Sequence, residues 1–162
     1  SLGARLGLGG VGEPAPLWTH QLQLTIPDCV AEAHDTHHPL STGLYYEDQR
    51  EAALARARAF REERIPKFLN WFETVLKRNP SGDLHLVGDV LTYADLSLFQ
   101  LVAGLRYAFP KAAVRALADT PAVAKLHANI GRRQRVHDYL RSPRRIAFNE
   151  DGIFRAYPEL DG

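Results

Sequence analysis

The sequence predicts an all-α fold, a bundle of five to six helices followed by an ordered C-terminal tail. Along most of the 162 residues, apolar side chains recur at steps of three and four, as they do on a helix with one buried face. Turn-forming clusters of proline, glycine, serine and asparagine separate these stretches. No stretch of the chain has the pattern of a β-strand, so helices are the expected building blocks.

The composition excludes several classes of function. Lysine and arginine number 20 against 19 acidic residues, and the net charge of +1 gives no general attraction to nucleic acid or to an anionic membrane. No segment approaches the roughly 18 apolar residues of a membrane-spanning helix. Cys29 is the only cysteine, which excludes an intrachain disulfide and fits a reducing compartment. We therefore expect a cytoplasmic protein without nucleic-acid or membrane partners.

The opening of the chain, residues 1–16, has the composition of a linker. It is rich in helix breakers, namely Gly3, Gly7, Gly9, Gly10, Gly12, Pro14 and Pro16. The chain contains no methionine and begins at Ser1, so we expect it to be a fragment of a longer protein.

The first two helices are predicted from their apolar spacing. One runs from Leu17 to about His38, with Pro27 as a possible bend, and ends at a turn around Pro39. A longer helix is expected from about Glu47 to Lys77, half exposed, with a kink at Pro66. Its buried face would carry Phe60, Ile65, Phe68, Leu69, Phe72, Val75 and Leu76.

The sharpest local pattern is the segment GDVLTYADLSLF, residues 88–99. Thr92 is placed to cap a helix and Asp95, three residues later, to bond back to it, which makes a capping box. Leu91 and Leu96 are positioned as the accompanying hydrophobic staple. Apolar residues then cover nearly every direction of the helix up to Pro110, so we expect it to be buried at the centre of the bundle.

Two shorter helices and a tail complete the prediction. Thr120 and Pro121 open one helix that ends at Gly131, and a last one continues to Leu140. The tail, residues 142–162, has no helical period but is too apolar for a solvated segment, so we expect it to pack against the bundle. Its apolar residues are Ile146, Phe148, Ile153, Phe154 and Tyr157.

The segment GDVLTYADLSLF resembles the start of the central buried helix in cytosolic glutathione transferases. The string TPAVAKLHANIGRRQRVHDYLRS, residues 120–142, is similar to a later helix pair of that family, although Gln134 stands where many relatives carry proline. Residues 2–8 look like the end of the last helix of the family's thioredoxin-like domain. The resemblance implies that residues 1–16 are the end of that domain and the linker, and that residues 17–162 are the helical C-terminal domain.

The resemblance also implies a function for the intact protein. Family members conjugate glutathione to small hydrophobic electrophiles in detoxification, commonly as homodimers, and the helical domain supplies most of the electrophile pocket. Glutathione would be a substrate, and we expect no metal. The thiol-activating residue is expected in the missing domain, so this chain alone should be inactive. The alternative is a non-catalytic protein-interaction domain of the same fold.

The segment DCVAEAHDTHHP, residues 28–39, is the one chemically dense part of the chain. In the family, an acidic residue on this helix reaches the partner subunit's glutathione, and Glu32 resembles it, since a carboxylate can pair with the peptide's ammonium group. The bland alternative is a solvated or capping acid.

His34, His37 and His38 allow three interpretations. Imidazoles three and four residues apart share a helix face and suit zinc, copper or nickel, but a metal site also needs converging ligands with outer-shell support. Histidines in a last turn also favour the negative end of the helix dipole. The resemblance implies the third interpretation, in which His34, His38 and Pro39 form a wall of the electrophile pocket.

Aromatic residues supply the remaining candidates. Tyr45 follows the turn and could reach the same pocket, and Phe154 could fold over its mouth as C-terminal segments of the family do. Packing is the alternative for both residues. Of the two tryptophans, Trp18 is expected to face the missing domain and Trp71 to lie on the buried face of the long helix.

Overall fold

The computed structural model describes residues 2–162, and every regular element in that range is a helix. The all-α prediction is therefore confirmed. Among the described residues, no helix combines the length and apolar character needed to cross a bilayer. The elements in order are α1 (Leu2–Arg5), α2 (Ala15–Asp35), η1 (Tyr46–Gln49), α3 (Arg50–Ala59), η2 (Phe60–Arg64), α4 (Ile65–Arg78), α5 (Tyr93–Ala108), α6 (Pro110–Asp119), α7 (Pro121–Gly131), α8 (Gln134–Leu140) and α9 (Pro158–Asp161).

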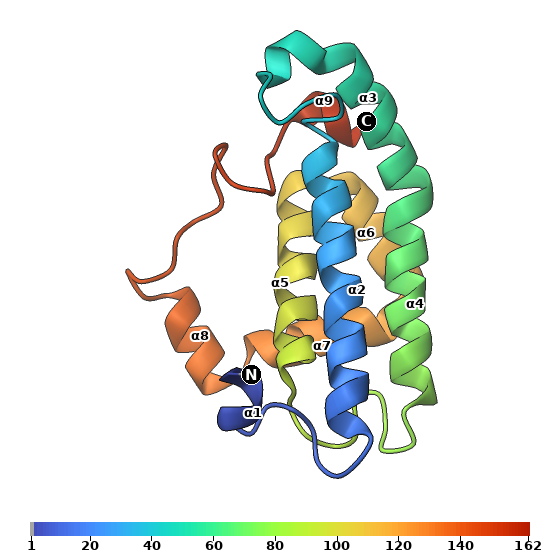
Figure 1. Cartoon of the computed structure of the whole chain (residues 1–162), viewed down its shortest axis with the longest axis vertical. Coiled ribbons are helices and arrows are strands. Elements are labelled where there is room, and N and C mark those ends of the chain that lie inside the picture. The colour runs from blue at the N-terminus through green and yellow to red at the C-terminus, as the bar shows by residue number, and fades with distance from the viewer. Residues whose placement is uncertain (1) are drawn as a thin grey trace.

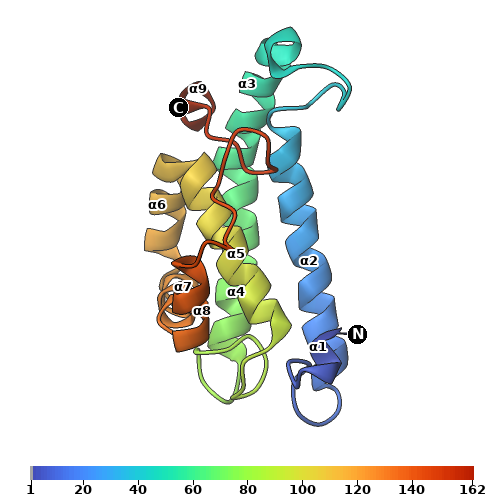
Figure 2. The ribbon, with the colours of Figure 1, turned by 90° about the vertical axis from the view of Figure 1, so that its left-hand side faces the viewer.

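Three long helical segments form the body of the bundle. The helix α2, the joined helices α3 and α4, and α5 stand side by side, while α7 crosses one end (Figure 1). The most extensive packing is between α2 and α5, and α7 packs on both α4 and α5. After α8 the chain runs back along α5 as an irregular tail, and α9 docks beside α3 (Figure 2).

The helix α5 is the buried centre that the sequence predicts. It is lined on several sides by fully enclosed residues, among them Leu98, Leu101, Val102 and Leu105, each 1% exposed or less. Its first turn contains the capping box of Thr92 and Asp95. The cap fixes the residue at which α5 begins. The apolar side chains of α5 therefore face α2, α6 and α7.

The long second helix is continuous but not uniform. One turn of 3-10 helix, α3, one turn of π-helix and α4 follow one another from Tyr46 to Arg78 without a break. The π turn, Phe60–Arg64, ends two residues before Pro66, which lies in the first turn of α4. A proline there lacks the N–H that an α-helical bond would need, so the irregular turn stands where the sequence predicts a kink.

The helix α6 has no counterpart in the sequence prediction. Pro110 ends α5, as expected, but it also occupies the first turn of α6. Proline is favoured at that position because its fixed φ suits a helix start and its missing N–H would have no intrahelical partner. The same residue therefore separates two helices and begins the second.

The C-terminal tail packs on the bundle through only some of its apolar residues. Phe154 is buried against α5, where the Cβ of any larger residue at Gly104 would lie 2.5 Å from its ring. Phe148 stacks on Tyr107, with ring centroids 4.8 Å apart. The packing expected of Ile146 and Ile153 was wrong, since these side chains are 84% and 48% exposed.

Candidate functional site

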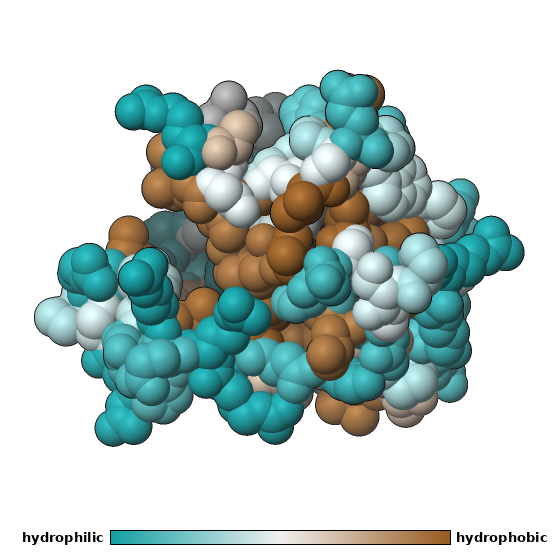
Figure 3. Space-filling view, turned by 90° about the horizontal axis from the view of Figure 1, so that it is seen from below, coloured by the Kyte–Doolittle hydropathy of each residue, from teal (hydrophilic) through white to brown (hydrophobic). Residues whose placement is uncertain are grey.

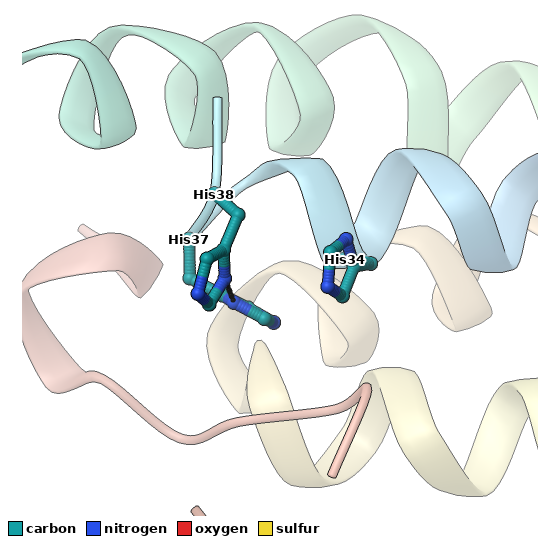
Figure 4. A group of neighbouring side chains, drawn as sticks. All are labelled: His34, His37 and His38. Atoms are coloured by element: carbon teal, nitrogen blue, oxygen red, sulfur yellow. Dashed lines mark hydrogen bonds between the residues drawn. The ribbon is translucent and has the colours of Figure 1, made fainter. Parts of the chain in front are cut away.

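The candidate site lies at the carboxyl end of α2, where the helix meets the C-terminal tail. His34 is in the last turn of α2, and His37 and His38 follow in the turn after it. Figure 4 shows the three imidazoles close together, with the tail running past them. His34, His38 and Pro39 are partly exposed, whereas His37 is 1% exposed.

The three histidine rings contact one another. The rings of His34 and His38 are stacked, with centroids 5.1 Å apart, and His37 lies edge-on to both. Nδ1 of His37 is 2.5 Å from Nδ1 of His38, and its Nε2 is 2.9 Å from the carbonyl oxygen of Ile153 in the tail. The cluster therefore joins α2 to the tail.

Two of these histidines have lowered pKa values. Burial lowers the pKa of His37 to about 4, with a further contribution from the cationic Arg155. Burial and Arg155 also lower the pKa of His38 below its ordinary value. Both rings are therefore neutral at pH 7, which leaves them able to accept a hydrogen bond or bind a cation. For His37 and His38, which follow the end of α2, neutral rings give little support to the helix-dipole interpretation.

Glu32 has a partner within its own chain. Nε and Nη2 of Arg64, in the π turn, donate to its two carboxylate oxygens at 2.8 and 2.7 Å. This bidentate pair raises the pKa of Arg64 and fixes the direction of both side chains. Each carboxylate oxygen retains a further lone pair, so Glu32 could still accept from another donor.

The two tyrosines have different environments. Tyr46 is buried, stacks on Tyr157 with centroids 4.0 Å apart, and donates to a carboxylate oxygen of Glu159 at 2.9 Å. Tyr45 is 78% exposed. The structure therefore gives Tyr46 an anchoring position between η1 and the tail, and leaves Tyr45 open to a ligand or a second domain.

An apolar cavity of about 560 Å³ lies at the opposite end of α2. Trp18 and Trp71 form one wall, in an edge-to-face pair with centroids 6.4 Å apart. Figure 3 shows apolar surface gathered on this end of the molecule. Residues of the loops before α2 and before α5 line the cavity there. The burial expected of Trp71 was wrong, because it points to this cavity and is 42% exposed. None of His34, His38, Pro39, Tyr45 and Phe154 lines this cavity.

Residues 34–143, more than half of the chain, match the family model described as "Glutathione S-transferase, C-terminal domain". The chain belongs to the glutathione S-transferase family. The matched residues include the histidine cluster, the long helix and the capped start of α5. The family resemblance drawn from the capping box is thereby confirmed.

Individual relatives agree with this assignment. The "Glutathione S-transferase" of Plasmodium yoelii yoelii is 30% identical over 79 residues, 43% of this chain and 37% of the relative. "Glutathione S-transferase P" of Capra hircus is 28% identical over 127 residues, 64% of this chain and 59% of the relative. The chain thus spans well under two thirds of the length of these relatives.

Solved structures of glutathione S-transferases share the fold. The Pi-class enzyme of Onchocerca volvulus superposes with a TM-score of 0.66 at 17% identity, covering 86% of this chain and 59% of that one. NaGST-2 superposes with a TM-score of 0.62 at 18% identity, covering 91% and 66% of the two chains. At these identities the likeness concerns the fold alone.

Sequence reasoning missed two contacts of this glutathione S-transferase domain. Arg64 lies 32 positions from Glu32, and Ile153 lies 116 positions from His37. A helical wheel describes neighbours within one helix, so neither partner has a local signal.

Proposed function

We propose that this chain is the helical, electrophile-binding domain of a two-domain glutathione transferase that conjugates glutathione to small hydrophobic electrophiles. The match of residues 34–143 to the C-terminal domain of the family carries the proposal. The relatives named as glutathione S-transferases support it. Glutathione would be the substrate of the intact protein, attacking the electrophile as a thiolate.

Residues 1–16 would be the end of a preceding thioredoxin-like domain and the linker, with residues 17–162 as the helical domain. The contacts of this segment support the assignment. Tyr93 N donates to the carbonyl oxygen of Leu8 at 2.9 Å, and Gly3 packs on the Tyr93 ring. The segment is thus tied to the capped start of α5, which would fix where the preceding domain sits.

The electrophile would bind at the carboxyl end of α2. His34, His38, Pro39 and Tyr45 are accessible there and would form one wall, and the preceding domain would form the other. Phe154 is buried, so its part would be to hold the tail in place beside that wall. His38, held neutral by its lowered pKa, would be able to accept a hydrogen bond from a bound ligand.

Activation of the glutathione thiol would come from the missing domain. A thiol becomes nucleophilic when a hydrogen bond or a positive charge lowers its pKa. The chain's own Cys29 is fully buried, and burial raises its pKa far above the ordinary value. It therefore cannot serve as a reactive thiol, and a free buried cysteine also agrees with a cytoplasmic protein.

We also infer a homodimer, in which Glu32 would reach the partner's glutathione. Leu17 and Leu24, seven residues apart on one face of α2, are 76% and 52% exposed, and Trp18, which pairs with Trp71, follows Leu17 in the same helix. Exposed apolar side chains grouped in this way are typical of a protein interface. Light scattering after size exclusion tests the dimer, and Leu24→Glu should give monomers if α2 forms the interface.

Binding to immobilised glutathione tests the proposed function. The 162-residue chain should pass through the column, whereas the parent protein with its upstream sequence should bind and conjugate a chlorodinitrobenzene. Retention of the chain alone would overturn the division of labour between the domains. A parent protein that neither binds nor conjugates would favour the alternative, a non-catalytic interaction domain, for which the Trp18 and Trp71 cavity would be the contact surface.

A further inference from the structure

Three histidine side chains, one in the last turn of α2 and two just after the helix ends, lie together at the carboxyl end of α2. Each of His34, His37 and His38 offers a ring nitrogen, and these three atoms all lie within 4.8 Å of one another. Thr36, the residue that ends α2, keeps helical dihedral angles, and the rings of His37 and His38 lie against that of His34. The ring centroids lie 4.7 to 5.1 Å apart, and because the rings of His34 and His38 are stacked, one of them would have to turn for both to direct a nitrogen at a shared ion.

The tail supplies the second observation. The carbonyl oxygen of Ile153 can only accept, so Nε2 of His37 carries the ring hydrogen and, in the neutral ring, Nδ1 carries a lone pair. That lone pair accepts a hydrogen bond from Nδ1 of His38, 2.5 Å away, and a cation bound by His37 would take the place of this bond. Metal-binding histidines almost always donate their other N–H to a carbonyl or a carboxylate, which fixes the tautomer and the ring plane. His37 has this arrangement while 1% exposed.

The charges around the cluster have opposite signs. The carboxylate of Asp35 lies 3.6 Å from Nδ1 of His34, where it can orient that ring. The guanidinium of Arg155 is the opposing cation, but its hydrogen bonds go to the backbone carbonyls of Gly152 and Asp151. The guanidinium of Arg155 is thus held within the tail, while Nδ1 of His37 faces the other histidines.

We propose that His34, His37 and His38 form a binding site for one borderline divalent cation such as Zn²⁺, at the carboxyl end of α2. Imidazole nitrogen suits zinc, and water would complete a tetrahedral set. From sequence alone we expect no metal, because a helical wheel shows neither convergence nor an outer-shell partner. The geometry supplies both. A bound ion would also lock the tail, since Ile153 holds the central ligand.

Calorimetric titration of the 162-residue chain with Zn²⁺ at pH 7.5 tests the site. We expect saturation at one ion per chain. His37→Gln is the informative variant, because its side-chain amide can still donate to the Ile153 carbonyl but lacks a nitrogen at the Nδ1 position. His37→Gln and His38→Ala should each weaken binding at least tenfold. His20→Ala, at an exposed histidine of the same helix, should leave it unchanged.

Thermal melting provides a second measurement with the same proteins. Zn²⁺ should raise the melting temperature of the wild type and of His20→Ala, and not that of His37→Gln, which should melt near the wild type without metal. The proposal is overturned by the absence of saturable binding, or by equal binding in all four proteins. Neither result bears on glutathione chemistry, since the titration uses the chain without glutathione.

Discussion

His37 is a buried histidine held neutral by its surroundings. Its ring is 1% exposed, donates to the tail at Ile153 and lies edge-on to Tyr157. Burial lowers the pKa to about 4, against an ordinary value of 6.5. In the unfolded chain the His37 imidazole is therefore protonated near pH 6.5, whereas in the folded chain it is protonated only at a much lower pH.

The free energy of unfolding should fall as pH is lowered from 6.5 to about 4. In this window the unfolded state binds more protons than the folded state, so stability rises with pH, by on the order of 2 kcal/mol across it. Urea denaturation at several pH values, with a chelator present, measures the slope. His37→Gln should reduce it. Some slope should remain, because burial also lowers the pKa values of His38 and His127. An unchanged slope in His37→Gln would contradict this assignment.

Asp95 does more than close a capping box. Its carboxylate accepts from the backbone N–H and the hydroxyl of Thr92, each at 2.7 Å, and from the backbone N–H of Leu86 at 2.8 Å. The residue is fully buried. One side chain therefore fixes both the first turn of α5 and the loop that leads into it.

Asp95→Ala should destabilise the domain by about 3 kcal/mol, because it removes a helix cap and leaves buried donors without acceptors. Asp95→Asn keeps one acceptor oxygen and should lose less. Asp119→Ala, at an exposed position near the end of α6, is the control and should change stability by less than about 0.5 kcal/mol. Urea denaturation measures all three, and equal losses in Asp95→Ala and Asp119→Ala would refute the role of Asp95.

At this scale the sequence predicts contacts within one helical turn and no further. The Thr92 and Asp95 pattern could be predicted because both partners lie three residues apart. The bond from Leu86 to Asp95 joins residues nine positions apart, one in the loop and one in α5, and that from Arg64 to Glu32 joins the π turn to α2. Trp71 was misplaced for a similar reason, since its exposure depends on where Trp18 of α2 lies.

Helices α4 and α7 are joined by a buried carboxylate. Glu73 is 4% exposed and accepts from the backbone N–H groups of Ala122 and Val123 at 2.9 and 3.0 Å. These groups lie in the first turn of α7, where helix N–H groups have no partner within the helix. Lys77, four residues on, places its ammonium 3.0 Å from the other oxygen. Glu73 thus caps α7 from a neighbouring helix.

Glu73→Ala should cost about 2 to 4 kcal/mol, since two buried N–H groups lose their acceptor. Glu73→Gln retains an amide oxygen and should cost clearly less. Glu62→Ala, at an exposed position of the π turn, provides a matched control with little effect. The free energies come from urea denaturation. A Glu73→Ala protein as stable as Glu62→Ala would show that Glu73 does not hold the two helices together.

A helix could be predicted from the sequence wherever its own residues carry an apolar period or a capping pattern. The apolar period of α2, the long amphipathic face of α4 and the cap of α5 were each sufficient. The helix α6 was missed because its buried face consists of alanines, Ala112, Ala113 and Ala116, which give little hydrophobic contrast. Its start is capped from outside, by Asp161, so no local capping residue marks it.

The whole molecule is closed by its tail. Tyr157 stacks on Tyr46, Phe154 packs against Gly104, and Asp161 accepts from the backbone N–H groups of Lys111 and Ala112 at the start of α6. These contacts join residues 49 or more positions apart. The sequence predicts that the tail packs because of its apolar content, but composition alone cannot say which residues face inward.

Two substitutions in the tail test whether its contribution to stability comes from particular buried side chains or from its apolar composition as a whole. Leu160 is 2% exposed beside Asp161, whereas Ile146 is 84% exposed, although both are aliphatic residues of the same segment. Leu160→Ala should therefore cost about 2 to 4 kcal/mol, through lost burial and a cavity between α9 and the bundle. Ile146→Ala should change stability by less than about 0.5 kcal/mol. Urea denaturation compares them directly. Similar losses for both variants would mean that the tail contacts the bundle through its apolar content at large, and not through the anchored end that caps α6.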